Sequence, residues 1–323
     1  MRLRITRTTL IGQLAACCAL LLALAACSGP SLDIPPTPTP NPSAASMVSN
    51  HQHGETGPNA RLITRYGGPV AVELSTQPVK PQPNTPFTIT YSLKDKDGSG
   101  LAGDRLRLTH ERLMHLIVVS QDLQQFAHIH PQDMGDGRYM VGTSVEAAGK
   151  YLLFNEFVTA DGTTQIERNL VATGGAEDVD TPAALVPNVG QPQQVEGLTV
   201  TLTSAASRVR RRAAATFNLN VTKDGQPATD LQPFLGAACH VVIVSADTKQ
   251  FAHTHGDVPG GAMSGDMSGM NMGTMAMPTP PAHFGPALQF THTFMQPGLY
   301  RVWVQFGHED KVVTVAYNVQ VIK

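Results

Sequence analysis

Hydrophobic and polar residues alternate along this chain in short runs that are typical of β-strands. These runs are rich in β-branched and aromatic residues and are bounded by glycine, aspartate and proline. No helical period lies between them. In the first half the runs are 70–74, 87–93, 116–119, 138–145, 151–158 and 166–172, and in the second half they are 198–202, 217–221, 241–244, 288–294, 300–306 and 312–321. This spacing predicts an all-β fold built from antiparallel sandwiches of the immunoglobulin type.

The two series of runs repeat one another. Residues 115–131 read HLIVVSQDLQQFAHIHP and residues 240–256 read HVVIVSADTKQFAHTHG, the same pattern displaced by 240 − 115 = 125 positions. Tyr151 and Tyr300 also match across the halves. A match that extends through the whole series indicates a tandem duplication of one domain. We therefore expect β-sandwich domains at 66–175 and 194–323, joined by a linker at 176–193.

The N-terminal 27 residues have the features of an export signal. A basic start is followed by an apolar stretch from Ile11 to Leu24, too short for the ~20 residues that a membrane span needs. The sequence Leu-Ala-Ala-Cys at 24–27 resembles the lipobox of bacterial lipoproteins. That resemblance implies that Cys27 carries lipid, becomes the new N-terminus and anchors the protein to the outer face of a membrane. The alternative is ordinary signal cleavage after Ala25. Residues 28–65 are rich in proline and threonine and predict an extended tether.

Charge and cysteine content narrow the function classes. The chain carries 23 basic and 25 acidic side chains, and removal of the three arginines in the signal leaves 20 − 25 = −5. This balance gives no electrostatic case for a nucleic-acid partner. Loss of the signal and lipidation of Cys27 would leave only Cys239, so we expect no intramolecular disulfide. Cys239 is either a buried small side chain or a soft metal ligand.

The repeated histidines form a candidate metal site. Two histidines at positions i and i+2 of a strand point to one face with Cα atoms about 6.6 Å apart, close enough for both rings to reach one ion. A further histidine opens each repeat. The alternative is that these side chains are structural and hydrogen-bond a buried strand end. The metal-ligand candidates are His115, His128, His130, His240, His253 and His255.

From His130 to Gly149 the first domain has 19 positions, and from His255 to the matching Gly298 the second has 43. The second domain therefore carries 24 extra residues after its His-x-His pair, in an insert at about 257–284 that is rich in methionine. Thioether sulfur is a soft, neutral donor that suits Cu(I) far better than Zn(II), Ca(II) or Mg(II). The alternatives are an adaptable hydrophobic flap and a sink for oxidants. The segment Met-Ser-Gly-Met-Asn-Met at 267–272 resembles the methionine motifs of bacterial copper-resistance proteins found outside the cytoplasm. The candidate ligands here are Met263, Met267, Met270, Met272, Met275 and Met277.

The repeated HLIVVS…FAHIHP pattern is similar to that of exported bacterial proteins with immunoglobulin-like domains, and it resembles the group called YtkA-like. This resemblance covers both domains and implies the fold and an exported location more firmly than an activity. The second copy departs from the pattern, because Gly256 stands where the first copy has Pro131.

Three functions are consistent with the sequence. The first is a lipid-anchored protein outside the cytoplasm that sequesters Cu(I) or exchanges it with an envelope protein that donates or accepts copper. The second is an envelope interaction module without metal. The third, an enzyme, is disfavoured, because G-x-S-x-G is absent and the repeated Ser-x-Asp pairs, Ser120/Asp122 and Ser245/Asp247, fit a turn after a strand. We expect no catalytic residues.

Overall fold

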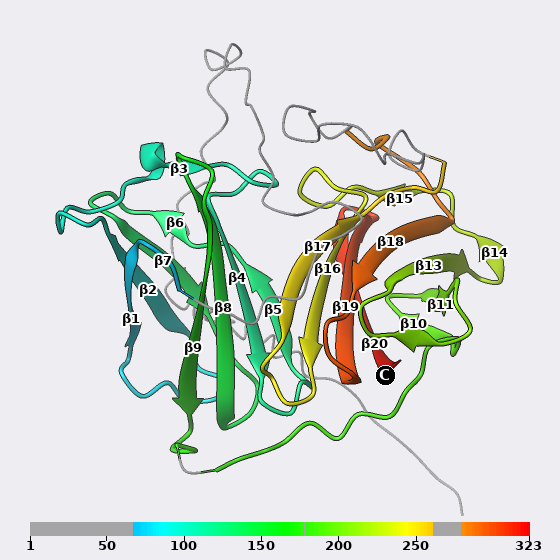
Figure 1. Cartoon of the computed structure of the whole chain (residues 1–323), viewed down its shortest axis with the longest axis horizontal. Helices are drawn as coiled ribbons and strands as arrows, with labels where there is room; N and C mark the ends of the chain where they lie inside the picture. Colours follow the sequence, from blue (N-terminus) through cyan, green and yellow to red (C-terminus); the bar gives the residue numbers. More distant parts are fainter. Residues whose placement is uncertain (1–66, 178, 261–278) are drawn as a thin grey trace, which may run out of the picture. The chain divides into compact units, whose positions relative to one another are not determined.

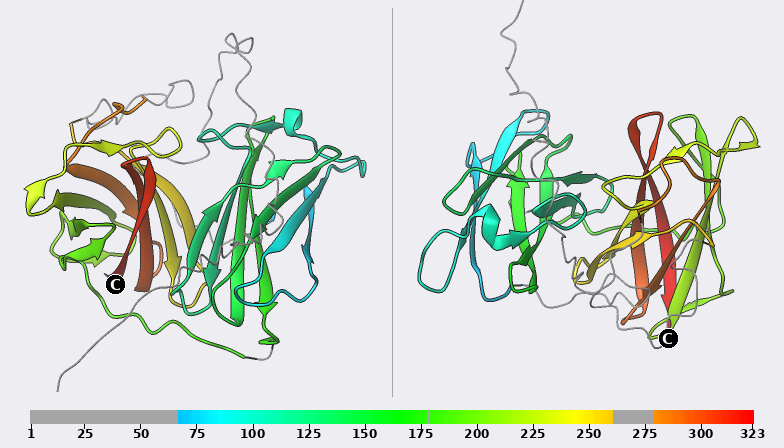
Figure 2. Two further views of the ribbon diagram at one scale, coloured as in Figure 1. Left: turned by 180° about the vertical axis from the view of Figure 1, so that it is seen from behind. Right: turned by 90° about the horizontal axis from the view of Figure 1, so that it is seen from above.

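The computed structural model describes residues 67–177, 179–260 and 279–323, and strands make up almost all of their regular structure. The predicted all-β fold of two tandem immunoglobulin-like sandwiches is confirmed. Each sandwich consists of two sheets that face one another (Figures 1 and 2). Within the described residues, no helix has the length and apolar character that a membrane crossing requires.

The first sandwich pairs a four-stranded sheet with a five-stranded sheet. The smaller sheet has the order β1-β2-β7-β6, formed by β1 (Ala71–Gln77), β2 (Phe87–Lys94), β7 (Arg138–Thr143) and β6 (Gln132–Asp133). The larger sheet has the order β3-β8-β4-β5, with β9 also paired to β8. Its strands are β3 (Leu106–Arg107), β8 (Gly149–Thr159), β4 (Met114–Ser120), β5 (Phe126–Ile129) and β9 (Thr164–Thr173).

The second sandwich repeats this plan with short additional strands. One sheet contains β10 (Gln193–Val195), β11 (Leu198–Ser204), β13 (Ala214–Lys223), β14 (Gln226–Pro227) and β18 (Ala287–Thr293). The other has the order β12-β20-β19-β16-β17, with β15 also paired to β19. Its strands are β12 (Val209–Arg210), β20 (Lys311–Ile322), β19 (Gly298–His308), β16 (Cys239–Ser245), β17 (Phe251–Gly256) and β15 (Leu231–Gln232).

All twelve runs predicted from the hydrophobic pattern form strands. The pairing of β4 with β8 and that of β16 with β19 have the same register. In the first sandwich Ile117 lies opposite Phe154, and in the second Val242 lies opposite Trp303. The prediction did not include the four- and six-residue strands β5 and β17 among the runs, although these strands carry the His-x-His pairs.

Strand β4 is buried on both faces, and the other sheet of its own sandwich covers only one of them. Leu116 and Val118 point into the core of their own sandwich. Ile117 and Val119 point the opposite way and pack in a third apolar cluster that joins the two sandwiches. The cluster contains Ile117, Val119, Leu123, Leu152, Phe154, Ile166, Leu185, Val242, Val244, Phe251 and Trp303.

Two aromatic pairs cross this contact in equivalent positions. Phe126 of β5 stacks on Trp303 of β19 with ring centroids 4.9 Å apart, and Phe251 of β17 stacks on Phe154 of β8 at 4.3 Å. Each sandwich therefore contributes the same strand positions to the other. Such pairs contribute about 0.5–1.5 kcal/mol beyond the burial of their apolar area.

The segment between the sandwiches is fastened to the second one. Leu185 is buried in the shared apolar cluster. The backbone N–H of Asn318 donates to Asn188 Oδ1 at 2.6 Å, and Asn318 Nδ2 donates to the carbonyl of Val186 at 2.7 Å. These contacts hold the connection along β20, so it contributes to the contact between sandwiches.

The substitution Phe126→Ala tests the contact between the sandwiches. Trp303 is the only tryptophan in the chain, so its fluorescence reports on this surface. We expect Phe126→Ala to shift the emission to longer wavelength and to lower the free energy of unfolding by about 2–4 kcal/mol. Leu170→Ala is the control, because Leu170 is 54% exposed; both quantities should stay near wild type. Unchanged emission in Phe126→Ala would contradict the packing of this face.

Candidate metal centre

The apolar surface shared by the two sandwiches gives way to histidine at one end. His115 precedes Ile117 by two residues on β4, and His240 precedes Val242 by two residues on β16. Strand alternation therefore places both histidines on the shared face. The histidines of the two His-x-His pairs follow Phe126 and Phe251 along the same face. The structure brings all six predicted histidines together, with His110 as a seventh.

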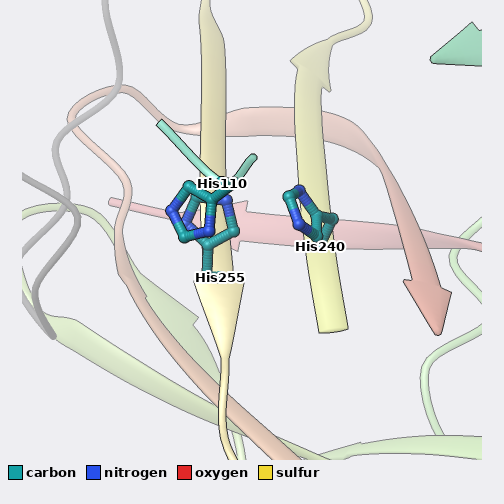
Figure 3. Close-up of side chains that lie close together, drawn as sticks. All are labelled: His110, His240 and His255. Carbon is teal, nitrogen blue, oxygen red and sulfur yellow. The ribbon is translucent and has the colours of Figure 1, made fainter. Parts of the chain in front are cut away.

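These rings are in mutual contact across the two sandwiches. The His115 and His240 centroids lie 6.2 Å apart, and those of His128 and His253 lie 5.0 Å apart. His110, from the turn before β4, stacks on His255 with a centroid separation of 3.5 Å (Figure 3). The cluster therefore belongs to both domains.

Burial keeps five imidazoles of the cluster neutral: His115, His128, His130, His240 and His255. Burial, reinforced by the charge of nearby His253, lowers the pKa of His115 to about 4. Burial and neighbouring His115 lower the pKa of His130 to about 3. The pKa values of His128, His240 and His255 also lie well below the usual range, with burial as the first cause. Neutral imidazole is the form that binds metal ions.

The hydrogen bonds of His115 and His128 leave one lone pair of each ring facing the other ring. His115 Nε2 lies 2.9 Å from the carbonyl oxygen of Thr109, which can only accept, so Nε2 carries the proton. His128 Nδ1 lies 2.8 Å from Oε1 of Gln305, and it donates there for the same reason. In their neutral forms His115 Nδ1 and His128 Nε2 are then both unprotonated. These two nitrogens lie 3.0 Å apart.

An ion between these nitrogens would resolve the conflict. Two nitrogens 3.0 Å apart can both lie about 2.1 Å from one ion, with an angle of about 90° at the metal. The alternative is a proton shared between the rings, which burial of the charged form disfavours. The geometry therefore fits a metal ion better than it fits two neutral rings alone.

The first histidine of each His-x-His pair is oriented by the other sandwich. Gln305 of β19 accepts from His128, and Glu156 of β8 accepts from His253 Nδ1 at 2.8 Å. These acceptors occupy equivalent positions, because Glu156 lies opposite His115 and Gln305 lies opposite His240. Burial acts to raise the pKa of Glu156, but the hydrogen bond and charge of His253 outweigh it, so the pKa is lowered. Outer partners of this kind fix the tautomer of a metal-binding histidine.

Three groups of three histidines bring one ligand nitrogen from each ring within 4.8 Å of the others. Ligand nitrogens of a tetrahedral site lie about 3.4 Å apart, so small ring rotations would close any of the groups on one ion. The groups are His110, His240 and His255; His115, His128 and His130; and His128, His240 and His253.

Several ring nitrogens of the cluster are buried without a hydrogen-bond partner in the described part of the chain. They are Nε2 of His130, Nε2 of His240 and both ring nitrogens of His255. A buried polar atom with no partner is costly, so most such atoms in folded proteins are satisfied. A bound metal ion would satisfy these nitrogens. A purely structural role of the histidines would leave them unsatisfied.

The sulfur residues beside His115 and His240 are not part of the cluster. Met114 and Cys239 point into the cores of their own sandwiches and are fully buried there, as strand alternation predicts. Burial raises the pKa of the Cys239 thiol to about 12, so it remains a neutral small side chain. A Cβ at Gly256, where the first copy has proline, would lie 2.6 Å from both Cys239 Sγ and the carbonyl oxygen of Gln289.

The other predicted sites have different outcomes. Ser120 Oγ donates to Asp122 Oδ1 and accepts from the N–H of Gln125, and Ser245 makes the corresponding bond to Asp247. These pairs form turns, as the sequence indicated. The predicted lipidation site Cys27 and the ligands Met263, Met267, Met270, Met272, Met275 and Met277 lie outside the described residues.

The sequence analysis missed His110 and Glu156. His110 has no counterpart in the second repeat, where Leu235 stands, so the repeated pattern did not select it. Glu156 and Gln305 are polar residues at equivalent places in two mainly apolar strand runs, LLFNEF and RVWVQF. A polar residue at the same place in both apolar runs was the signal that could have identified them.

The lowered histidine pKa values predict that the metal-free protein loses stability in acid. Below pH 6.5 the unfolded chain protonates these histidines, whereas the folded chain protonates His115 only near pH 4 and His130 only near pH 3. Each proton bound only by the unfolded chain reduces the free energy of unfolding by about 1.4 kcal/mol per pH unit. Urea unfolding of chelator-treated protein between about pH 7 and about pH 5 should show this loss.

The substitution His130→Gln should make this pH dependence shallower, whereas His283→Gln should not, because His283 is exposed. Equal pH dependence for His130→Gln and wild type would contradict the neutral buried state of His130.

Comparison with known proteins identifies the family of this chain. No curated protein matches the chain. The Yersinia pseudotuberculosis adhesin InvE is 12% identical with a TM-score of 0.24, over 78% of this chain and 59% of that one. The Escherichia coli adhesin FdeC is 12% identical with a TM-score of 0.24, over 79% and 66%. The Clostridium thermocellum CbhA fibronectin(III)-like modules are 10% identical with a TM-score of 0.20, over 78% and 93%.

This chain therefore spans less than two thirds of the length of each of the two adhesins. A family model described as a domain of unknown function, DUF8832, matches residues 64–174 and 193–323, segments that contain the two sandwiches. The chain belongs to the DUF8832 family.

Proposed function

We propose that this protein binds a transition-metal ion outside the cytoplasm, in the histidine cluster shared by its two domains, and that the metal is copper. The observation that carries this proposal is the 3.0 Å approach of His115 Nδ1 and His128 Nε2. Both nitrogens are unprotonated when the rings are neutral. Around them lie further buried imidazole nitrogens that have no hydrogen-bond partner among the residues that the structure describes.

The ligand chemistry limits the choice of metal. Calcium and magnesium prefer oxygen ligands, and the cluster supplies imidazole nitrogens. Imidazole suits zinc, copper, iron and nickel. Because neutral ligands do not offset the charge of a buried ion, an ion of low charge such as Cu(I) is favoured here over a dication.

The methionine-rich insert supports copper among these metals. Met263 follows His255 by eight residues, and eight residues extend at most about 29 Å. Thioether ligands that prefer Cu(I) are therefore tethered within a short distance of the histidine cluster. We propose that the methionines capture Cu(I) and that the histidines hold it more firmly. An envelope protein that donates or accepts copper would be the partner.

The proposed location depends on the N-terminal sequence. The Leu-Ala-Ala-Cys ending at Cys27 supports a lipid anchor on the outer face of a membrane, with the proline- and threonine-rich residues 28–65 as a tether. In that compartment the two domains would meet extracytoplasmic metal before any cytoplasmic protein does.

A metal-free interaction module is the second candidate. The observation in its favour is that His128 and His253 hydrogen-bond Gln305 and Glu156 across the two sandwiches. In this view the histidines only hold the domains together. Added metal would then leave the melting temperature unchanged, which separates this function from the first.

Metal binding by the histidine cluster predicts stabilisation of the wild-type protein. An ion present at 100 times its dissociation constant should stabilise the folded state by about 2.7 kcal/mol. His128→Ala should weaken binding by more than the roughly 10–100-fold loss that follows removal of an outer hydrogen-bond partner. Thermal unfolding with and without Cu(I) or Zn(II) measures the first effect, and chelator competition measures the second.

His283→Ala is the matched control, because His283 is an exposed histidine of the second domain; it should bind metal as the wild type does. If neither metal raises the melting temperature of the wild-type protein, the interaction module becomes the better proposal.

Deletion of residues 263–277 tests the role of the methionines. We expect apparent Cu(I) affinity to fall by at least about tenfold, or about 1.4 kcal/mol, while Zn(II) affinity stays at the wild-type value. Chelator competition on the full chain in detergent measures both. Unchanged Cu(I) affinity would remove the methionine segment from the proposed function and leave only the histidine cluster.

A further inference from the structure

We propose that the histidine cluster holds two metal ions in unequal sites, one within the first domain and one that His110 completes across the domain contact. This inference rests on the proposed function and adds the number of ions and their ligands. The first site consists of His115, His128 and His130, and the second of His110, His240 and His255.

The seven histidines divide into these sites without conflict. The two groups share no residue, so both can be filled together. The third group takes His128 from the first site and His240 from the second, and adds His253. His253 already has a partner on each ring nitrogen: Nδ1 bonds Glu156 Oε2 at 2.8 Å, and Nε2 lies 3.1 Å from His240 Nδ1. His253 is therefore a positioning residue.

His110 lies in a turn of the first domain that has an equivalent turn in the second. In the first domain Thr109 and Arg112 form an isolated bridge, and in the second Phe234 and Ala237 form the same bridge. The residue after the first bridge position has a φ of 46° at His110 and 47° at Leu235. The backbone is thus the same in both copies, and the side chain differs. The six other clustered histidines occupy equivalent positions in the two domains, whereas His110 has no histidine at its equivalent position.

This difference changes the surroundings of the two strand-opening histidines. In the first domain the carbonyl of Thr109 accepts from His115 Nε2 and directs Nδ1 toward His128. In the second domain His240 Nε2 is buried with no hydrogen-bond partner among the described residues, and His240 itself is 0% exposed.

The ring of His110 lies beside this unsatisfied histidine. Its centroid is 5.2 Å from that of His240 and 3.5 Å from that of His255 (Figure 3). Both ring nitrogens of His255 also lack a hydrogen-bond partner within residues 67–177, 179–260 and 279–323. The first domain therefore supplies the third ligand of this site.

The two sites should consequently differ in what they do. The first site takes all three ligands from the first domain, so its ion can bind without a ligand from the second domain. The second takes one ligand from the first domain and two from the second, so its ion joins them. Occupancy of the second site is then linked to the contact between the sandwiches.

Zinc stoichiometry of the full chain in detergent tests this inference. Zn(II) is the probe because it accepts imidazole and binds thioethers poorly, so the methionine segment does not contribute. After dialysis against buffered zinc, elemental analysis gives the ions per chain. We expect His110→Leu to bind one ion fewer than wild type. Any zinc on histidines elsewhere in the chain adds equally to every variant and cancels in the difference.

His110→Leu is suited to this test because Leu235 occupies the equivalent position in the second domain with the same backbone conformation. Emission of Trp303 provides the check on folding. His283→Leu, at an exposed histidine, is the matched control and should retain the wild-type stoichiometry.

Two further variants separate the possible failures. If His110→Leu binds as many ions as wild type while His128→Ala binds fewer, the second site is wrong and the proposed function stands. If His128→Ala and His240→Ala both retain the wild-type stoichiometry, the histidine cluster binds no metal and the proposed function fails with it. Loss of all zinc in His110→Leu with normal Trp303 emission would replace two sites by one shared site, and would overturn the inference.

Discussion

The packing of one central sheet against its duplicate is the interaction on which the rest of this structure depends. Without the pairs Phe126–Trp303 and Phe154–Phe251, each His-x-His pair would lie on an exposed sheet face, and the pair of the second domain would lack His110 beside it. The contact removes water from the histidines, which lowers their pKa values. It also brings Gln305 and Glu156 within hydrogen-bonding distance of the opposite domain. Apolar burial therefore both assembles the ligands and maintains their neutral form.

Because side chains alternate along a strand, β4 and β16 each face the core of their own sandwich on one side and the surface shared by the sandwiches on the other. Met114 and Cys239 fill the cores of their own sandwiches, while His115 and His240, one residue later, belong to the shared cluster. A shift of one residue would exchange these sets and bury two histidines in apolar cores. The apolar residues on both faces thus fix the register that positions the ligands. The same constraint explains why the neighbouring sulfur atoms do not take part.

The sequence was sufficient for the all-β fold, the duplication and six of the seven clustered histidines, because these depend on local period and on repetition. It was not sufficient for what covers the second face of 116–119, because a run that is apolar on both faces does not say which surface it meets. His110 was missed for a related reason. It lies in a turn, and its importance comes from His240 and His255, which are more than a hundred residues away in the chain.

Departures from the duplication carry more information than the repeat itself. At the positions of Glu156 and Gln305, one domain supplies a carboxylate and the other a neutral amide. The carboxylate hydrogen-bonds His253 and lies opposite His115, on whose charge it also acts, whereas the amide lies beside His128. A nearby negative charge offsets part of the cost of burying a cation. The Glu156 carboxylate would therefore offset part of the charge of an ion held by His115, in the site within the first domain.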